Sequence, residues 1–239
     1  MNASKAERTS DPVRGGKAAR FQCTMAFERQ ARSKGYQRIA GADEAGRGAL
    51  FGPVFAAAVV LSPDRPIRGL DDSKLLEPSR RQALSLRIRE RAAAWAVAAA
   101  DAFEIDRWNI LEASRLALLR AVAALNPPCD YLLVDAVRLA WPGPQQPIVH
   151  GDARSRSIAA ASILAKVARD ECMAQWDAVF PEYGLARNKG YPTPDHSAAL
   201  ARIGPTFLHR FSYAPVRFAS QVVFWPEQPS LFASPGGAH

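Results

Sequence analysis

Two adjacent acidic residues, Asp43 and Glu44, stand in the most apolar part of this chain. The runs on either side of them, residues 38–42 and 52–61, have the composition of short strands bounded by glycine or proline. The pair is therefore predicted to lie at a strand end within a sheet core. Burying one carboxylate is costly unless it is paired or bound to metal, and a neighbouring carboxylate adds repulsion. We expect a cation beside the pair, with a divalent metal ion as the simplest candidate and Arg47 as the other.

Strands and helices alternate along much of the remaining chain. Strands that end in an acid are predicted over 130–135 and, in a shorter form, over 147–152. Helices are predicted over 78–100, 109–125 and 155–177. This alternation predicts an α/β fold, with a mixed β-sheet flanked by helices.

The composition divides the chain into four expected segments. The first is a basic, flexible N-terminal arm with a short helix near its end, and the second is the α/β domain. The third, rich in glycine, proline and aromatic residues, is a small helical extension packed on that domain, with a helix at 194–202, and the last is a flexible tail. Their bounds are 1–35, 36–178, 179–225 and 226–239.

Hydrophobic residues make up 48% of the chain, which is ample for a packed core. The longest apolar runs have about ten residues, whereas a helix across a bilayer needs about 20, and the N-terminus has no signal-peptide pattern. The three cysteines, Cys23, Cys129 and Cys172, fit neither a disulfide framework nor zinc spacing. We therefore expect a cytoplasmic protein.

Positive charge is concentrated at the N-terminus. The net charge is +8, and residues 1–38 hold nine Lys/Arg against three Asp/Glu. A basic arm of this kind could bind a polyanionic partner. The alternative interpretation is a solvating tail without a specific role.

Two further acids, Asp135 and Asp152, stand at or directly after predicted strand ends, where they can converge with Asp43 and Glu44. Ligand sets made only of oxygen select hard cations, so Mg²⁺ or Mn²⁺ is expected, together with phosphoryl chemistry. Asp170 is the other candidate for the fourth carboxylate of the site. It lies about 15 residues, or roughly 22 Å, from the start of the predicted 155–177 helix, whereas Asp152 lies next to that start. Asp152 is preferred, and Asp170 is interpreted as a helix-surface charge.

These residues belong to ordered motifs that resemble the type 2 ribonucleases H, the ribonuclease HII family, over residues 35–215. The motifs are Ala42-Asp43-Glu44-Ala45-Gly46-Arg47-Gly48, Asp72-Ser73-Lys74, Leu133-Val134-Asp135, Gly151-Asp152, Ala160-Ala161-Ser162-Ile163-Leu164-Ala165-Lys166-Val167 and Lys189-Gly190-Tyr191-Pro192-Thr193. The resemblance implies a ribonuclease H-like mixed sheet with a helical C-terminal extension.

The resemblance also implies an endoribonuclease. Its members hydrolyse RNA in RNA–DNA hybrids and cut on the 5′ side of single ribonucleotides in duplex DNA, leaving 3′-hydroxyl and 5′-phosphate ends. Asp43, Glu44, Asp135 and Asp152 match the family's catalytic carboxylates, which hold two divalent ions. A binding protein without catalysis and a DNA nuclease of the same fold are the alternatives.

Substrate-binding residues follow from the same resemblance. The Gly46-Arg47-Gly48 segment matches the motif that recognises the ribose 2′-hydroxyl, and Tyr191 matches the tyrosine that packs against the neighbouring sugar. Arg47 paired with an acid and Tyr191 as a packing residue are the structural alternatives. Lys74, Lys166 and Lys189 are candidate phosphate contacts, with solvent-facing lysine as the alternative.

Three features depart from the family pattern or lie outside it. Ala136-Val137 replace a Gly-Asn pair found in many members, and His150 stands where lysine is common. His196 and His209 are expected to be structural or to contact phosphate rather than to bind metal.

The tail sequence Gln228-Pro229-Ser230-Leu231-Phe232 resembles the short peptide by which bacterial replication proteins dock on the sliding clamp. Gln228, Leu231 and Phe232 are the candidate partner-binding residues, and an inert tail is the alternative. The expected partners are thus nucleic acid and a clamp, with the chain itself a monomer.

Overall fold

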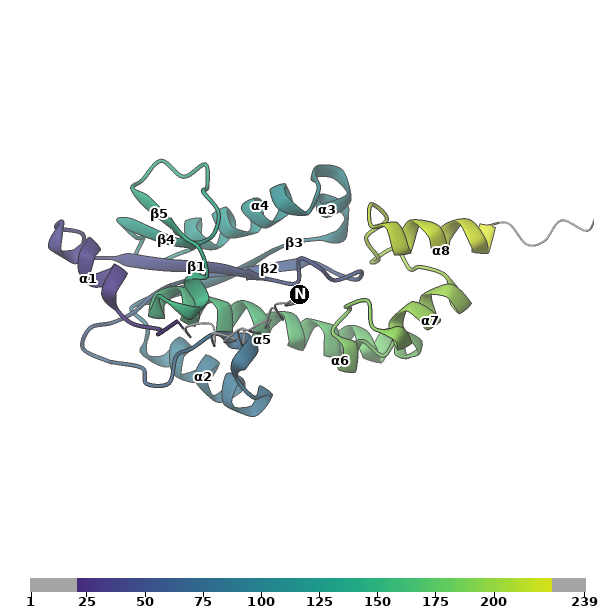
Figure 1. Ribbon diagram of the computed structural model, residues 1–239, viewed down its shortest axis with the longest axis horizontal. Coiled ribbons are helices and arrows are strands. Elements are labelled where there is room, and N and C mark those ends of the chain that lie inside the picture. The colour runs from purple at the N-terminus through teal and green to yellow at the C-terminus, as the bar shows by residue number, and fades with distance from the viewer. Residues whose placement is uncertain (1–20, 225–239) are drawn as a thin grey trace, which may run out of the picture.

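The computed structural model describes residues 21–224, with side chains described to residue 221, and its centre is a five-stranded sheet (Figure 1). The strands are β1 (Ile39–Ala45), β2 (Val54–Val60), β3 (Ala94–Ala100), β4 (Tyr131–Asp135) and β5 (Gln145–Ile148). Their order is β3-β2-β1-β4-β5. Strand β2 is antiparallel to β1 and β3, whereas β4 is parallel to β1 and β5. The predicted mixed sheet is confirmed, and the strand with the acidic pair lies at its centre.

Helices cover both faces of the sheet, and α3 (Ala102–Trp108) and α4 (Ile110–Ala123) lie on the face opposite α2 (Pro78–Arg91) and α5 (Arg156–Val179) (Figure 1). Alternate residues of a strand face opposite sides. In the central strands these residues are mostly alanine and valine, which form one apolar cluster with α4 and another with α5. Small side chains let both helical layers lie close to the sheet.

Residues 94–100 correct the expected helix over 78–100. Helix α2 ends at Arg91, and β3 follows, paired with β2 from Ala94↔Val60 to Ala100↔Val54. Alanine has a high helix propensity, which misled the prediction. Pairing with an adjacent strand and burial against α4 outweigh that preference.

Two other boundaries differ from expectation. Asn109 is the N-cap of α4 rather than part of it, and its side-chain oxygen accepts hydrogen bonds from the backbone N–H groups of Leu111 and Glu112. The predicted strand over 147–152 is shifted toward the N-terminus, because β5 ends at Ile148 and a short 3-10 helix, η2 (Gly151–Ala153), carries the acid.

Helix α5 begins directly on top of β1. Ser155 caps it by accepting a hydrogen bond from the N–H of Ile158. A β-carbon at Gly41 would overlap the backbone of Ser157 and Ile158. The glycine thus allows the helix to start in contact with the strand that carries the acidic pair.

The C-terminal extension is helical, as expected, and lies at one end of the sheet (Figure 1). It contains η3 (Pro181–Tyr183), α6 (Leu185–Asn188), α7 (Pro194–Ile203) and α8 (Ala214–Phe224). Leu50 and Phe51, in the loop after β1, share an apolar cluster with Leu200 of α7. The extension therefore packs on the loop that contains Gly46-Arg47-Gly48.

Helix α1 (Ala26–Ser33) lies within the predicted N-terminal arm. Its Ala31 belongs to an apolar cluster with Ile39 of β1 and Ile148 of β5. Residues 1–20 and the tail residues Gln228, Leu231 and Phe232 lie outside the described part of the chain. No helix among the described residues is long and apolar enough to cross a membrane.

Candidate active site

Strand register brings Asp43 and Asp135 together. In the parallel pair β1–β4, Gly41 lies opposite Leu133, so Asp43 and Asp135 follow two residues later on the same face. That face is the one against α5, whose Ser162 donates a hydrogen bond to Asp43. Both carboxylates thus lie at one edge of the sheet, beneath the first turns of α5.

Asp152 reaches the same place through a tight turn after β5. His150 has a left-handed backbone, with φ of 55°, and the N–H of Gly151 donates to Oδ1 of Asp135 at 2.7 Å. A β-carbon at Gly151 would lie 3.2 Å from that oxygen and 2.6 Å from Cδ1 of Ile158. A side chain at this position would displace Ile158 and crowd Asp135, and the backbone hydrogen bond of Gly151 fixes the segment of Asp152 relative to Asp135.

The four carboxylates repel one another. Burial is the main cause that raises the pKa of Asp43 well above its usual range, and the charges of Glu44, Asp135 and Asp152 raise it further. The pKa of Glu44 is also raised, first by burial and partly offset by Arg47. The pKa of Asp135 is raised chiefly by burial and also by Asp152, against the hydrogen bond from Gly151. The cluster therefore lacks enough positive charge of its own.

Two cations lie at this cluster. Nζ of Lys74 is 3.0 Å from Oδ2 of Asp152, and Nη1 of Arg47 is 3.2 Å from Oε1 of Glu44. Arg47 thus forms the ion pair with an acid that is the structural alternative to its predicted role in substrate binding. The side chain of Lys74 is largely exposed, and it begins in η1 (Ser73–Leu75), where Ser73 hydrogen-bonds Ser162 of α5.

The side chains around Asp43 suit a hard divalent cation. Oε2 of Glu44 is buried without a hydrogen-bond partner. All the candidate metal-ligand atoms are carboxylate oxygens, the ligand type that Mg²⁺ and Mn²⁺ prefer. Within residues 21–224, no three His, Cys, Asp or Glu side chains already surround one point as ligands do. Asp43, Glu44, Asp135 and Asp152 are the residues that could close around such an ion.

Asp170 lies on α5 away from this cluster. It forms an ion pair with Lys166, one helical turn earlier, and its Oδ2 is 3.6 Å from Nη2 of Arg81. Local partners thus neutralise Asp170, as expected. The same pair occupies Lys166, one of the three lysines predicted to contact phosphate.

Two buried arginines, which no sequence pattern marks, hold the loop after β1. Arg169 of α5 is fully buried and donates to the carbonyls of Phe51, Pro53 and Lys189. It passes directly beside Gly46, where any β-carbon would overlap its Nε. Arg169 therefore joins the Gly46-Arg47-Gly48 segment to the Lys189-Gly190-Tyr191 turn.

Arg210 supports the same loop from the extension. It is fully buried and donates to the carbonyls of Arg47 and Gly52, each at 2.9 Å. Burial lowers the pKa of Arg210 to about 10, and the nearby charge of Arg169 adds to that effect. A buried arginine without a carboxylate hydrogen-bond partner is unusual. Arg169 and Arg210 therefore stand out as functional candidates only in the folded structure, where their burial is visible.

Tyr191 lies beside the glycine segment. A β-carbon at Gly48 would be 3.9 Å from Cε1 of Tyr191, and the guanidinium of Arg169 lies 5.8 Å from the centre of its ring. Lys189, two residues earlier, has a left-handed backbone with φ of 54°. The turn thus places a half-buried aromatic ring next to the Gly46-Arg47-Gly48 segment.

A pair of buried histidines fixes this turn, in the structural role expected of them. Nδ1 of His209 accepts from the N–H of Thr206 at 3.0 Å, so its Nε2 donates to Nε2 of His196 at 3.2 Å. Nδ1 of His196 then donates to the carbonyl of Tyr191 at 3.0 Å. Both rings are neutral in this arrangement, and neither lies near the carboxylates as a ligand.

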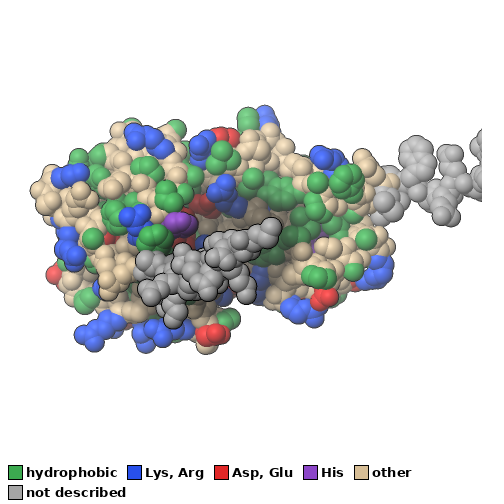
Figure 2. Space-filling view, viewed as in Figure 1, with side chains coloured by type: hydrophobic (Ala, Val, Ile, Leu, Met, Phe, Trp, Pro, Cys, Tyr) green, Lys and Arg blue, Asp and Glu red, His purple; other side chains and the backbone are tan. Residues whose placement is uncertain are grey.

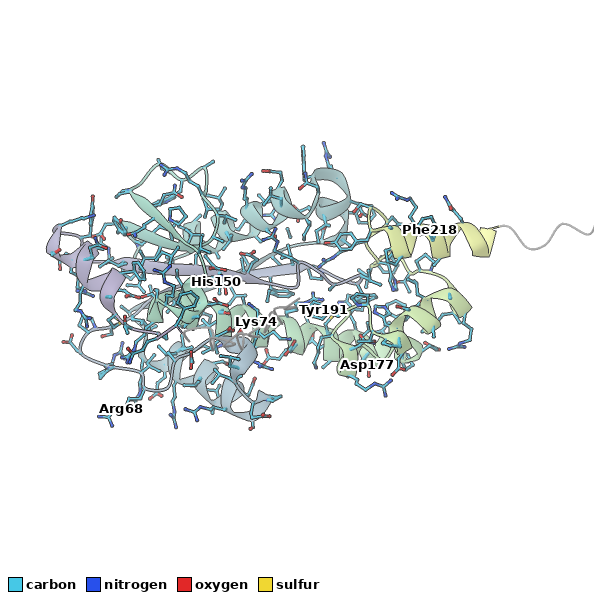
Figure 3. The ribbon with its side chains drawn as sticks, viewed as in Figure 1. Arg68, Lys74, His150, Asp177, Tyr191 and Phe218 are labelled. Atoms are coloured by element: carbon cyan, nitrogen blue, oxygen red, sulfur yellow. The ribbon has the colours of Figure 1, made fainter. Side chains whose placement is uncertain are left out.

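Figure 3 shows Lys74, His150 and Tyr191 around the centre of one face, between the sheet and α5. Figure 2 shows a hollow there, with acidic side chains inside it and Lys or Arg side chains on its rim. An acidic floor with a basic rim suits a polyanion that is held at its edges and meets metal ions at its centre.

Comparison with known proteins agrees with this geometry. Residues 40–216 match the model of the ribonuclease HII protein family. A ribonuclease HII of Solibacter usitatus is 56% identical over 225 residues, which cover 94% of this chain and 97% of that protein.

Two solved structures are also similar. The crystal structure of ribonuclease H2 from Pyrococcus horikoshii has a TM-score of 0.67 and 25% identity, and the match covers 77% of this chain and 98% of that one. Ribonuclease HII of Archaeoglobus fulgidus, solved in complex with PCNA, has a TM-score of 0.59 and 26% identity, over 69% of this chain and 87% of that one. With a family match over most of its length and a relative more than half identical, this chain belongs to the ribonuclease HII family of endoribonucleases.

Proposed function

We propose that this enzyme uses divalent metal ions to cut RNA in RNA–DNA hybrids and to cut on the 5′ side of single ribonucleotides in duplex DNA. The products would carry 3′-hydroxyl and 5′-phosphate ends. The observation that carries the proposal is the convergence of Asp43, Glu44, Asp135 and Asp152 beside the backbone of Gly46-Arg47-Gly48. Two of the candidate metal ligands, Asp43 and Glu44, thus lie in the strand that leads directly into the segment that would read the sugar.

Asp43, Glu44, Asp135 and Asp152 would hold two Mg²⁺ or Mn²⁺ ions, which supply activation of water and stabilisation of the leaving 3′ oxygen when bound. Gly151 orients Asp135 through its 2.7 Å hydrogen bond. Ser162 orients Asp43. Lys74, whose exposed side chain contacts Asp152, can move from that carboxylate to a substrate phosphate.

Selection of ribose rests on a rigid backbone. The carbonyl of Arg47 accepts hydrogen bonds from Arg210 and from the hydroxyl of Tyr213, so the loop cannot shift freely. Gly46 leaves room for Arg169 and Gly48 leaves room for a sugar to approach this backbone, whose polar groups can bind a 2′-hydroxyl. Tyr191 would pack against the neighbouring deoxyribose.

A cleavage assay tests the proposal. Duplex DNA with one ribonucleotide, an RNA–DNA hybrid and all-DNA duplex are each incubated with Mg²⁺ or Mn²⁺. We expect cleavage of the first two only, and Asp135→Asn should abolish it while far-UV circular dichroism stays unchanged. Equal cutting of all-DNA would indicate a DNA nuclease, and binding without cleavage would indicate a non-catalytic protein.

We also propose that Gln228, Leu231 and Phe232 bind a bacterial sliding clamp. Their peptide resembles a clamp-binding sequence, and a similar ribonuclease HII has been solved in complex with PCNA. The test is binding of a peptide of residues 226–239 to the clamp, with Leu231 and Phe232 changed to alanine as the control. Absence of binding at tens of micromolar peptide would refute this proposal.

A further inference from the structure

A series of hydrogen bonds connects a glutamate of α1 to the carboxylate cluster. Oε1 of Glu28 accepts from Oγ of Ser155, the cap of α5, at 2.7 Å. The N–H of Ser155 donates to the carbonyl of Gly151 at 2.8 Å. The N–H of Gly151 then donates to Oδ1 of Asp135 at 2.7 Å. Each residue in this series therefore holds the next one, from Glu28 to a candidate metal ligand.

The start of this series is buried. Glu28 is 2% exposed, and Ser155 is fully buried. Oε1 of Glu28 also accepts from the N–H of Ser157, in the first turn of α5, at 2.9 Å. Because a buried donor that loses its acceptor is costly, the first turn of α5 is held to Glu28.

The segment before Glu28 contacts both sides of the turn that carries Asp152. On one side, the ring of Phe21 stacks on that of His150, with centroids 5.5 Å apart and an interplanar angle of 28°. On the other side, Thr24 forms a parallel bridge with the cap of α5, through two backbone hydrogen bonds of 3.1 Å each. Figure 3 shows His150 near the centre of the face that carries the hollow. Residues 21–28 thus hold this turn before and after its acid.

We propose that Glu28 is a positioning residue for the metal site. It fixes the turn that carries Asp152 and the backbone N–H that orients Asp135, so the two carboxylates keep one relative position before a metal ion binds. Partners that orient metal ligands typically change metal affinity or activity by about 10–100-fold. The inference rests on the proposed function, in which these carboxylates bind metal. Glu28 lies outside residues 40–216, which match the family model.

Two substitutions of Glu28 remove or keep its hydrogen-bonding oxygen. Glu28→Ala removes the acceptor of Ser155 and Ser157. Glu28→Gln keeps an oxygen that can accept from both serines. It changes only the second carboxyl oxygen, Oε2, which has no hydrogen-bond partner within the described part of the chain. Glu28→Gln should therefore rescue the site.

Asp130→Ala is the matched control. Asp130 also accepts from two backbone N–H groups, those of Gln37 and Arg38, at 3.0 and 2.9 Å. These two residues precede β1, whereas the acidic pair lies toward the other end of that strand. The control thus removes a similar tie between distant segments without touching the turn after β5.

The first measurement is Mn²⁺ binding by isothermal titration calorimetry, which needs no substrate. Glu28→Ala should raise the Kd for Mn²⁺ by about tenfold, whereas Glu28→Gln should raise it by less than about threefold. Asp130→Ala should keep a Kd within about twofold of that of the unaltered protein, even if its melting temperature falls as far as that of Glu28→Ala. If Glu28→Ala does not fold, Glu28→Asp replaces it, because its shorter side chain draws the oxygen away from Ser155 and Ser157.

The second measurement is cleavage of duplex DNA with one ribonucleotide. At a fixed, limiting Mn²⁺ concentration, Glu28→Ala should lower kcat by about tenfold and change KM for the duplex less than about twofold. Excess Mn²⁺ should restore most of kcat, since the defect lies in metal binding.

An unchanged Kd for Mn²⁺ in Glu28→Ala would overturn the inference. Equal weakening in Glu28→Ala and Asp130→Ala would also overturn it, because a general loss of stability would then explain both. The proposed function fails separately, if the unaltered protein binds Mn²⁺ but does not cleave. In that case the ratio of Kd values still tests Glu28.

Discussion

The ring of Tyr191 lies against the backbone of Gly48, because a β-carbon at that glycine would be 3.9 Å from Cε1 of the tyrosine. The two residues come from turns 143 positions apart, and Arg169 donates to carbonyls on both sides of the junction. If the glycine segment reads the ribose and Tyr191 holds the next sugar, their contact defines an RNA–DNA junction.

Tyr191→Ala should therefore lower kcat/KM for a single embedded ribonucleotide by about tenfold, equivalent to roughly 1.4 kcal/mol, and lower hybrid cleavage less. Tyr191→Phe, which keeps the ring, should retain most activity. The measurement is the ratio of cleavage rates on the two substrates. An unchanged ratio in Tyr191→Ala would return this residue to a packing role.

Gly46 and Gly48 should differ in their tolerance of alanine. Gly46 has φ of 99°, and a β-carbon there would overlap Arg169, so Gly46→Ala should destabilise the protein by about 2 kcal/mol or more. Gly48→Ala, the matched control, meets only Tyr191 at an ordinary contact distance and should change stability by less than about 0.5 kcal/mol. Urea unfolding measures both, and equal effects would contradict the close approach of Arg169.

Asp43→Asn should make the metal-free protein more stable while abolishing cleavage. Burial and the charges of Glu44 and Asp135 raise the pKa of Asp43, so the ionised carboxylate is unfavourable in the folded state at neutral pH. Removing its charge should increase the free energy of unfolding by roughly 1 kcal/mol in EDTA. The check is thermal melting in EDTA at pH 7.5, and a lower melting temperature would contradict the repulsion.

The protein should become less stable as the pH is lowered below about 6.5, because of His196 and His209. Burial lowers the pKa of both, and that of His209 to about 3, with the neighbouring ring of His196 as a second cause. An unfolded histidine titrates near 6.5, so below about pH 6.5, and down to about pH 3 for His209, the unfolded chain binds protons that the folded histidines do not. The free energy of unfolding should then drop by up to about 1.4 kcal/mol per pH unit for each histidine.

The unaltered protein is the reference for this slope. In His196→Asn with His209→Asn, the slope between pH 6.5 and 4.5 should become smaller, whatever the stability at pH 7.5. Urea unfolding at several pH values gives both slopes. The same slope in both proteins would show that the buried pair does not cause it.

Ala136→Gly should stabilise the protein. Ala136 has φ of 51°, and a left-handed backbone costs a residue with a β-carbon about 1–2 kcal/mol. After the entropic cost of glycine, a gain of about 0.5–1 kcal/mol remains. Ala124→Gly, exposed like Ala136 but with φ of −82°, should instead destabilise, and opposite signs in thermal melting are the expected result.

Hydrophobic periodicity and residue type predicted the helices and strands in which these patterns are clear. The apolar runs of β1, β2 and β4 and the long helix α5 follow directly from residue type and period. Residues 94–100 do not, because an alanine-rich segment has no strong preference against helix, and only the edge of β2 made it a strand. The sequence pattern likewise placed Asn109 inside a helix, although its left-handed backbone ends α3 and its side chain caps α4.

The candidate site divides in the same way. By itself, the sequence determined that Asp43 and Glu44 occur in a sheet strand and that Asp135 and Asp152 follow strand ends, since a buried acid stands out against apolar neighbours. Only the tertiary structure decided that Arg169 and Arg210 support the glycine loop, that His196 and His209 hold the Tyr191 turn, and that Phe21 meets His150. The contacts of the two arginines with the glycine loop and the stacking of Phe21 on His150 join segments more than 100 residues apart. The burial of the two arginines and the two histidines exists only after the chain has packed.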